Sequence, residues 1–328
     1  MNNLNLPTLR SACIAHRHLG VTLKFNFFLL VVSLGFSLLF FSACAPTKVA
    51  KSSGLLTENI LGGIIGDTSF ERNNGIVLIV ITEEVPSQTP GTPPVKSQSI
   101  CTGSLIAPTI VLTAAHCFAR PNIKNAAIAF NVDVKNVTAN DVIFATDFKI
   151  NETFKPNNSK GTVFSEGFAW SDLALIKLEK AAPSNFQFAH LPTGNSQIIS
   201  TSTKLILAGY GVTTPIVNKS IKDPVTGASK VAHLPSAGAG TLRFVDNVTI
   251  LNVTPDNKEI LIDQQNGAIG ACHGDSGGPA YFKQDDGTFV LVGITSRGTN
   301  PLGNCDQSNV FTDVIGYLDW INANMGSM

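Results

Sequence analysis

The chain has little charge and no excess of either sign. Of its 328 residues, 23 are Lys or Arg and 23 are Asp or Glu, so only 14% are charged and the formal net charge is zero. No basic block is present, which argues against a nucleic-acid-binding protein. The sequence also lacks an internal repeat, a phosphate-binding glycine loop, a dinucleotide fingerprint and a cluster of metal ligands. It therefore implies no cofactor and no metal.

Long helical patterns are scarce, and short apolar runs bounded by Gly, Pro, Asn and Asp dominate instead. This pattern is typical of all-β proteins. Near the C-terminus, Ile315, Leu318 and Ile321 have helical spacing, which predicts a closing helix over about 314–325. The predicted strands are Gly75–Thr82, Gly103–Leu112, Ala126–Val132, Leu173–Leu178, Lys204–Gly209, Thr241–Val253, Glu259–Asp263, Thr288–Thr295 and Val310–Thr312.

Three motifs carry candidate chemistry: Thr113-Ala114-Ala115-His116-Cys117, Ser171-Asp172-Leu173-Ala174-Leu175 and Gly270-Ala271-Cys272-His273-Gly274-Asp275-Ser276-Gly277-Gly278-Pro279. A serine hydroxyl is a weak nucleophile that needs a base, and the base needs an acid group to hold its tautomer. His116, Asp172 and Ser276 supply these groups in the order His, Asp, Ser. Each motif alone is commonly a turn, a cap or a packing feature, so it is their combination that favours catalysis.

The three motifs resemble those of the trypsin/chymotrypsin family of serine proteases, and the resemblance extends over residues 64–324. It implies an all-β fold of two six-stranded antiparallel β-barrels, at about 64–185 and about 186–313, followed by the C-terminal helix. The peptidase domain would span 64–328, with the catalytic residues in the cleft between the barrels.

The resemblance also assigns roles. Ser276 would attack the scissile carbonyl, while His116 would act as general base and then as general acid. Asp172 would orient His116, and the backbone amides of Gly274 and Ser276 would form the oxyanion hole. Losing one such donor typically costs about a hundredfold or more in rate.

Six cysteines are present, and their spacing alone does not fix their pairing. The family resemblance implies the disulfides Cys101–Cys117 and Cys272–Cys305, which require an oxidising compartment. Cys13 and Cys44 lie outside these pairs.

The first residues form a leader. Residues 1–24 carry Arg10, Arg17 and Lys24 without an acidic residue, and 25–43 is almost wholly apolar, which predicts a signal peptide over 1–43. The apolar run is also long enough for a retained transmembrane helix. Because Phe41-Ser42-Ala43-Cys44 resembles a bacterial lipobox, we favour a lipoprotein with a lipidated Cys44 over plain secretion or a retained helix. Residues 44–63 would then be a tether and propeptide outside the cytoplasm.

An activation switch is also implied. Ile64-Ile65-Gly66-Asp67 resembles the family's new N-terminus, usually Ile-Val-Gly-Gly, so cleavage before Ile64 would free an ammonium that pairs with Asp275. Gly62-Gly63 stand where the family usually has Arg or Lys. Either the activating protease is not trypsin-like, or the register of the cleavage site is slightly different.

The residues expected around the substrate side chain depart from the trypsin pattern. Gly270 takes the floor position where an aspartate selects Arg or Lys, and Ser296-Arg297-Gly298 forms a wall usually written Ser-Trp-Gly. Asn309 replaces a pocket glycine and narrows the site. We expect a small or medium uncharged side chain there. An inward-pointing Asp306 is the alternative, and it would restore selection of basic residues.

The sequence therefore favours an extracytoplasmic serine endopeptidase whose partners are a protein or peptide substrate, an activating protease and, through Cys44, a membrane. A non-catalytic adhesion or binding protein on the same fold is the alternative, although such proteins usually lose a catalytic residue. An esterase-like acyl hydrolase would use the same chemistry. Loops 86–96 and 212–240 would border the cleft or be variable surface insertions.

Overall fold

A computed structural model describes residues 60–87, 91–155, 170–193, 199–214, 218–222, 229–233, 237–254, 256, 258–264 and 269–328. The predicted signal peptide, the lipidation at Cys44 and nearly all of the predicted tether lie outside these ranges, as do parts of loops 86–96 and 212–240. Within the described ranges, every helix is too short or too polar to cross a membrane.

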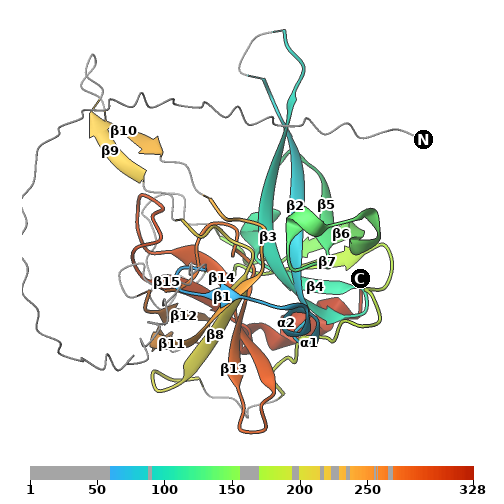
Figure 1. Ribbon diagram of the computed structural model, residues 1–328, viewed down its shortest axis with the longest axis vertical. Helices are drawn as coiled ribbons and strands as arrows, with labels where there is room; N and C mark the ends of the chain where they lie inside the picture. The colour runs from blue at the N-terminus through green and yellow to red at the C-terminus, as the bar shows by residue number, and fades with distance from the viewer. Residues whose placement is uncertain are drawn as a thin grey trace, which may run out of the picture. The chain divides into compact units, whose positions relative to one another are not determined.

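Six antiparallel strands close the first barrel in the order β2-β3-β4-β7-β6-β5 (Figure 1). Its core is largely aliphatic, and consecutive Ile, Leu and Val residues of β2 and β4 are buried in it. The strands are β2 Ile76–Val85, β3 Val95–Ala107, β4 Ile110–Thr113, β5 Ile123–Ala129, β6 Val142–Ile150 and β7 Ala174–Leu178.

The second barrel is also antiparallel. Its strands follow the order β11-β12-β15-β14-β13-β8, and β8 pairs back with β11 to close six strands, which confirms the predicted pair of barrels. The short β1, Ile64–Ile65, adds to β11 at the edge, and a separate hairpin joins β9 to β10. The strands are β8 Lys204–Gly209, β9 Asn218–Lys222, β10 Ser229–His233, β11 Arg243–Val253, β12 Glu259–Ile262, β13 Pro279–Lys283, β14 Phe289–Gly298 and β15 Asn309–Asp313.

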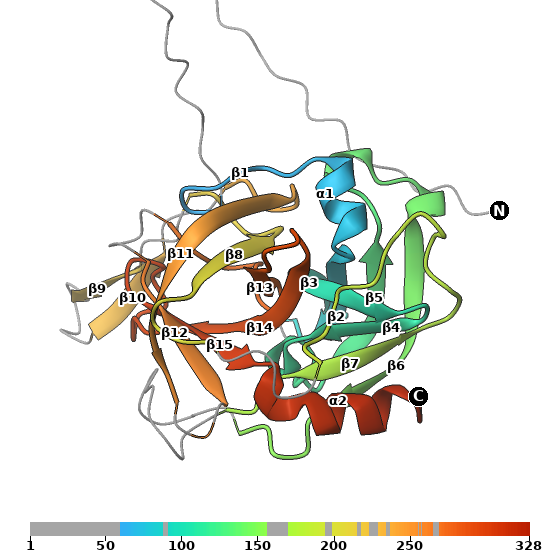
Figure 2. The same cartoon turned by 90° about the horizontal axis from the view of Figure 1, so that it is seen from below.

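Two α-helices flank the barrels within the described residues. Helix α1, Thr68–Asn73, is capped by Asp67, whose side chain accepts from the Phe70 amide at 2.7 Å. The predicted C-terminal helix is present as α2, Leu318–Met325, after a 3₁₀ turn over Ile315–Tyr317. It runs back from β15 alongside β6 and β7 (Figure 2), where Lys177 Nζ donates to the Met328 carbonyl at 2.8 Å. Other 3₁₀ turns are Ala115–Cys117, Val134–Asn136 and Ala139–Asp141.

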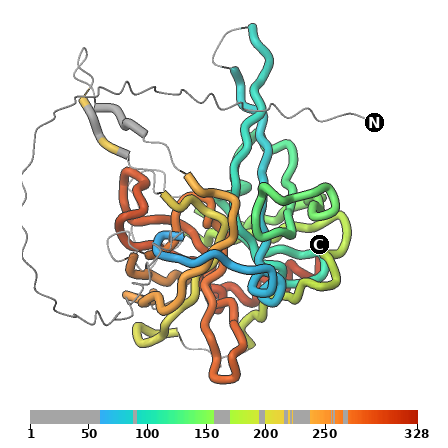
Figure 3. Tube along the Cα trace, viewed as in Figure 1, coloured from blue at the N-terminus to red at the C-terminus, as the bar shows by residue number. Residues whose placement is uncertain are grey.

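Strand β3 joins the first barrel to the Ser276 turn of the second. The Thr102 amide donates to the Ser276 carbonyl at 2.8 Å, and Thr102 Oγ1 donates to the Gly274 carbonyl at 3.0 Å. The same hydroxyl accepts from the Tyr210 amide at 3.1 Å. Farther along, the β2–β3 hairpin extends away from the barrel and carries loop 86–96 (Figure 3). The serine turn is therefore positioned by both barrels.

Candidate active site

His116 and Asp172 are brought together by the pairing of β4 with β7. His116 lies in the 3₁₀ turn that follows β4, and Asp172 lies just before β7. His116 Nδ1 donates to Asp172 Oδ2 at 2.7 Å, and the His116 amide donates to Oδ1 at 2.8 Å. Because Nδ1 is bonded to the carboxylate, Nε2 is the ring nitrogen that is left for another partner.

Asp172 is fully buried, and its contacts keep it ionised. Burial by itself would raise its pKa, but the charge and hydrogen bonds of His116, together with the Ser296 hydroxyl, hold the pKa of Asp172 below its usual value. Ser296 Oγ donates to Oδ2 at 2.7 Å, and Thr312 Oγ1 donates to the Asp172 carbonyl at 3.0 Å. Both donors come from the second barrel, so the acid group is fixed from across the cleft.

The segment just before Asp172 is anchored by a buried ion pair that sequence analysis missed. Arg297 forms two hydrogen bonds with Glu259, at 2.7 and 2.8 Å, and its guanidinium lies 4.5 Å from the Trp170 ring centroid. Glu259 Oε1 also accepts from the Trp170 amide at 3.0 Å. Tyr317 donates to Ser171 Oγ at 2.9 Å, at a residue whose φ is +52°. A glutamate opening the otherwise apolar strand β12 was the available signal for this anchor.

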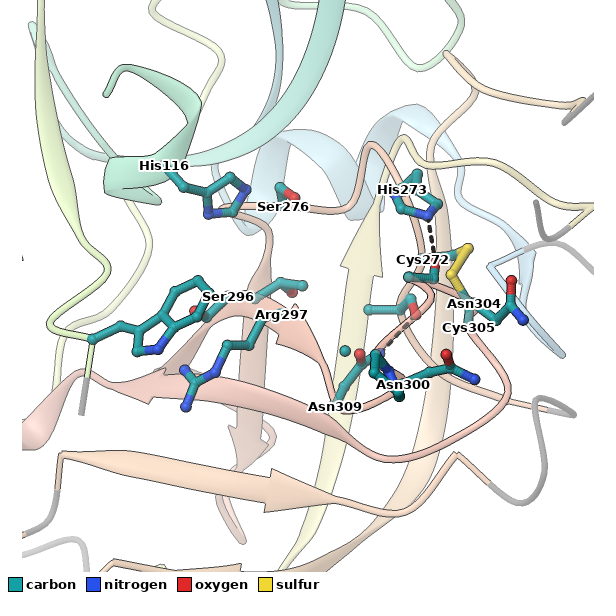
Figure 4. Close-up of a pocket in the computed structure, with 16 residues that line it drawn as sticks. His116, Cys272, His273, Ser276, Ser296, Arg297, Asn300, Asn304, Cys305 and Asn309 are labelled. Atoms are coloured by element: carbon teal, nitrogen blue, oxygen red, sulfur yellow. Dashed lines mark hydrogen bonds between the residues drawn. A yellow bond between two sulfur atoms is a disulfide. The ribbon is translucent and has the colours of Figure 1, made fainter. Parts of the chain in front are cut away.

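Ser276 lies on a turn that only glycines allow. Gly274 has φ +96° and Gly277 has φ +80°. A Cβ on Gly274 would lie 2.9 Å from Gly211 Cα, and one on Gly277 would lie 2.5 Å from the Thr102 carbonyl. Figure 4 shows the Ser276 side chain beside the His116 ring at the edge of one cavity.

The serine and the histidine are adjacent but not directly bonded. Within the described part of the chain, no hydrogen bond joins the Ser276 and His116 side chains, and the amides of Gly274 and Ser276 donate to no protein acceptor. Catalytic hydrogen bonds are often long without substrate and tighten in the complex. The two amides therefore remain available to a ligand.

Asp275 is buried beneath this turn. It accepts from the Gly211 amide at 2.8 Å and from the Cys272 amide at 2.9 Å. Burial raises the pKa of Asp275 to about 7, and the two amides and the more distant Arg243 offset this only in part. Among the described residues, no cation forms a salt bridge with it. A positively charged partner would therefore be needed to favour the ionised form of Asp275.

The expectation for Ile64 needs correction. Ile64 is 52% exposed and pairs with Phe244 in β1–β11, so it lies on an outer edge rather than beneath the serine turn. Ile60 and Leu61, four and three residues earlier, are instead 1% and 5% exposed. The physical reason is that the β1 pairing fixes Ile64 outside the barrel, while the apolar side chains before it fill the interior.

Leu61 reaches the immediate surroundings of Asp275. Its carbonyl accepts from the Gly270 amide at 2.9 Å, and its side chain packs against Val212 and the Cys272–Cys305 pair. The Cys272 amide is itself a donor to Asp275. Residues 60–61 therefore lie near Asp275, where we expected residues 64–65.

The cavity beside Ser276 has a volume of about 390 Å³. Ser296, Arg297, Gly298 and Asn309 line it as expected, but Gly270 does not. Ala271, the residue after Gly270, lines the cavity instead, and its carbonyl accepts from Asn309 Nδ2 at 2.7 Å. The lining residues are His116, Trp170, Ala271, Cys272, His273, Ser276, Thr295, Ser296, Arg297, Gly298, Asn300, Pro301, Gly303, Asn304, Cys305 and Asn309.

Two disulfides support the site, and both are the predicted pairs. Cys101–Cys117 ties β3 to the His116 turn, and Cys272–Cys305 ties the segment before Ser276 to the loop before β15. Asp306 does not point into the cavity, which was the alternative that would select basic residues. It is exposed, and its Oδ1 accepts from Asn300 Nδ2 at 2.7 Å.

Comparisons with known proteins agree with this geometry. The Trypsin family model matches residues 82–321. Chymotrypsin-C of Rattus norvegicus is 28% identical over 225 residues, covering 68% of this chain and 76% of the relative. Coagulation factor XII of Cavia porcellus is 26% identical over 245 residues, covering 70% of this chain but only 37% of the relative. A solved structure of HL collagenase shares the fold, with a TM-score of 0.56 at 20% identity over 81% of this chain and 99% of that one.

Proposed function

The chain belongs to the trypsin family of serine proteases, and we propose that it is a serine endopeptidase that cleaves peptide bonds through an acyl-enzyme. The observation that carries the proposal is the hydrogen bond from His116 to the buried Asp172, because His116 and Ser276 line the same cavity. Base, orienting acid and nucleophile are the three parts that serine acyl transfer needs.

In the proposed mechanism, His116 Nε2 takes the Ser276 proton as Oγ attacks the scissile carbonyl. Asp172 stays ionised and stabilises the resulting imidazolium. The imidazolium then gives its proton to the departing amine, which leaves an ester on Ser276. A water molecule, deprotonated by the same histidine, hydrolyses that ester and restores the enzyme.

The oxyanion of each tetrahedral intermediate would be held by the amides of Gly274 and Ser276. The positive φ of Gly274 turns its peptide out of the extended direction, and neither amide is used by the described part of the chain. Preorganised donors of this kind stabilise the transition state more than the substrate.

We assign the activating cleavage to the Asn59–Ile60 bond rather than to the bond before Ile64. Ile60-Leu61-Gly62-Gly63 also fits the family's Ile-Val-Gly-Gly pattern. Its first two residues are buried, and Leu61 packs against Cys272, whose amide donates to Asp275. Ile60 has φ +44°, an unfavourable value for a β-branched residue. Cleavage before Ile60 removes that restraint and creates an ammonium that can pair with Asp275.

The proposed location is outside the cytoplasm. Two disulfides beside the catalytic residues favour an oxidising compartment. The leader and Cys44 support anchoring as a lipoprotein, with plain secretion or a retained helix as the alternatives. Metabolic labelling with an alkyne fatty acid is expected to tag the wild type and not Cys44→Ser. Equal labelling of both would contradict lipidation at this residue.

The test of the proposed function is hydrolysis of fluorescent casein by three proteins: one that begins at Ile60, one that begins at Ala45, and the Ile60 form carrying Ser276→Ala. We expect the first to be active, the second to be weak and the third to be inactive. Activity that survives Ser276→Ala would refute the assignment of the nucleophile.

Two outcomes would favour the other candidate functions. A folded Ile60 form that cleaves p-nitrophenyl esters but no peptide would indicate an esterase-like hydrolase. A folded form with no activity on esters or peptides would indicate a binding protein that keeps the fold.

A further inference from the structure

The side-chain amide of Asn309 lines the cavity beside Ser276. Asn309 on β15 is 3% exposed, lines the cavity, and donates from Nδ2 to the Ala271 carbonyl at 2.7 Å. In Figure 4 Asn309 lies among the lining residues, away from His116 and Ser276. A substrate side chain that enters beside Ser276 would therefore meet Asn309, whereas Gly270 is not a lining residue.

A second amide closes the space behind the first. Gln264 is 1% exposed, and its Nε2 also donates to the Ala271 carbonyl. A Cβ on Gly270 would lie 2.7 Å from Gln264 Cγ and 2.8 Å from Gln264 Nε2, so Gln264 fills the volume that a larger residue 270 would need. The Ala271 carbonyl thus receives two amide donors, and a carbonyl oxygen has two lone pairs to offer.

These bonds orient the floor amide. Because Asn309 Nδ2 is directed at the Ala271 carbonyl, Asn309 Oδ1 is turned the other way. Asn309 Oδ1 would lie 3.3 Å from a Cβ placed on Gly298, which is on the cavity wall. The floor therefore presents a neutral hydrogen-bond acceptor to whatever enters.

The cavity offers no counter-charge for a basic side chain. Its lining includes no Asp or Glu among the described residues, and Asp306 is exposed and bonded to Asn300. The Arg297 guanidinium is paired with Glu259 and so does not select an acidic side chain. Burying an unpaired charge is costly, and so is burying a polar group without a partner. An uncharged hydrogen-bond donor fits this environment best.

We propose that Asn309 determines substrate selection, and that the enzyme prefers Asn, Gln, Thr or Ser immediately before the scissile bond, with Asn309 Oδ1 accepting a hydrogen bond from that side chain. The inference rests on the proposed endopeptidase function and narrows the expected small or medium uncharged side chain to one that carries a donor. An apolar isostere would leave Asn309 Oδ1 buried without a partner.

The test compares kcat/KM for peptide p-nitroanilides that differ only in the last residue. Near-isosteric pairs isolate the hydrogen bond: Asn against Leu, Gln against Met, and Thr against Val. We expect the donor-bearing member of each pair to be favoured by about tenfold, the order of one hydrogen bond within an enclosed site. Lys is expected to rank below both Asn and Gln.

Two variants assign the effect to the floor amide. Asn309→Leu removes the acceptor at similar volume and is expected to abolish or reverse the preference for Asn over Leu. Asn309→Asp places a carboxylate at the floor and is expected to raise the kcat/KM ratio of Lys to Asn at least tenfold, a gain that poor folding cannot imitate. Asn322→Leu, which changes an exposed asparagine of helix α2 outside the cavity lining, is the matched control and should keep the wild-type ratios.

Labelling by a fluorophosphonate, which reports Ser276 without requiring a particular side chain, separates this inference from the proposed function. Labelled wild-type protein that cleaves the apolar member of each pair as well as the donor-bearing one, or that cleaves none of these peptides, overturns the role of Asn309 alone. Wild-type protein that neither labels nor cleaves overturns both.

Discussion

Cleavage before Ile60 should change how stability depends on pH. In the uncleaved chain, burial raises the pKa of Asp275 to about 7 from the ordinary value of 3.8. The folded chain therefore keeps a proton that the unfolded chain has lost. The stabilisation from that proton is complete below pH 3.8 and is lost as the pH rises through about 7.

The size of the effect follows from the shift. Three pKa units correspond to about 4 kcal/mol, which is the cost of ionising Asp275 without a partner. In a protein that begins at Ile60, the new ammonium favours the ionised carboxylate and removes most of this cost. Burial also raises the pKa of Glu71 and of Asp313 to about 7, but both groups are present in both proteins and cancel in the difference.

The assay is urea unfolding from pH 4.5 to 7.5, with Ser276→Ala in every protein to prevent self-cleavage. We expect the free energy of unfolding of the Ala45 form to fall with pH relative to the Ile60 form, by up to about 4 kcal/mol at the upper end. Asp275→Asn in both forms should make the difference between their free energies of unfolding independent of pH. A constant gap between the Ala45 and Ile60 forms across this range would refute the pairing of Ile60 with Asp275.

Three further changes test the positioning of the site. Asp172→Asn should lower kcat by roughly 10⁴ with an unchanged fold, since it leaves the histidine in the wrong tautomer; steady-state kinetics within tenfold of wild type would contradict this role. Glu259→Gln should lower the free energy of unfolding by about 3–5 kcal/mol, because it leaves the buried Arg297 charge uncompensated. The double variant Glu259→Leu/Arg297→Leu should be less destabilised in the same urea titration, and a larger loss would argue against the charge explanation. Cys272→Ala/Cys305→Ala should lose about 4 kcal/mol by loop entropy over a sequence separation of 33, and an unchanged thermal midpoint would contradict that estimate.

Much of the fold was predictable because short apolar runs bounded by Gly, Pro, Asn and Asp mark many of the strands. Lys204–Gly209 was located to the residue. The run Gly103–Leu112 was predicted as one strand but contains a turn at Pro108, which separates β3 from β4. Strand β6 was missed because its outer face is polar or exposed, and helix α1 because its six residues, TSFERN, have no apolar period.

The proposed catalytic residues were accessible to sequence analysis because their flanking residues are constrained by the turns that hold them. The pocket floor was not, because no sequence pattern shows that Asn309 bonds to the Ala271 carbonyl or that Gly270 is not a lining residue. Likewise, Ile60 and Ile64 both open a plausible short motif. Only their difference in exposure, 1% against 52%, decides which one lies inside the protein.

The most direct test of the central proposal is labelling by a fluorophosphonate probe followed by peptide mapping. The protein that begins at Ile60 is expected to carry one label, on Ser276, and to lose it in both Ser276→Ala and His116→Ala. A folded, disulfide-intact Ile60 form that stays unlabelled, or that is labelled at another residue, would contradict the assignment of Ser276 as an activated nucleophile.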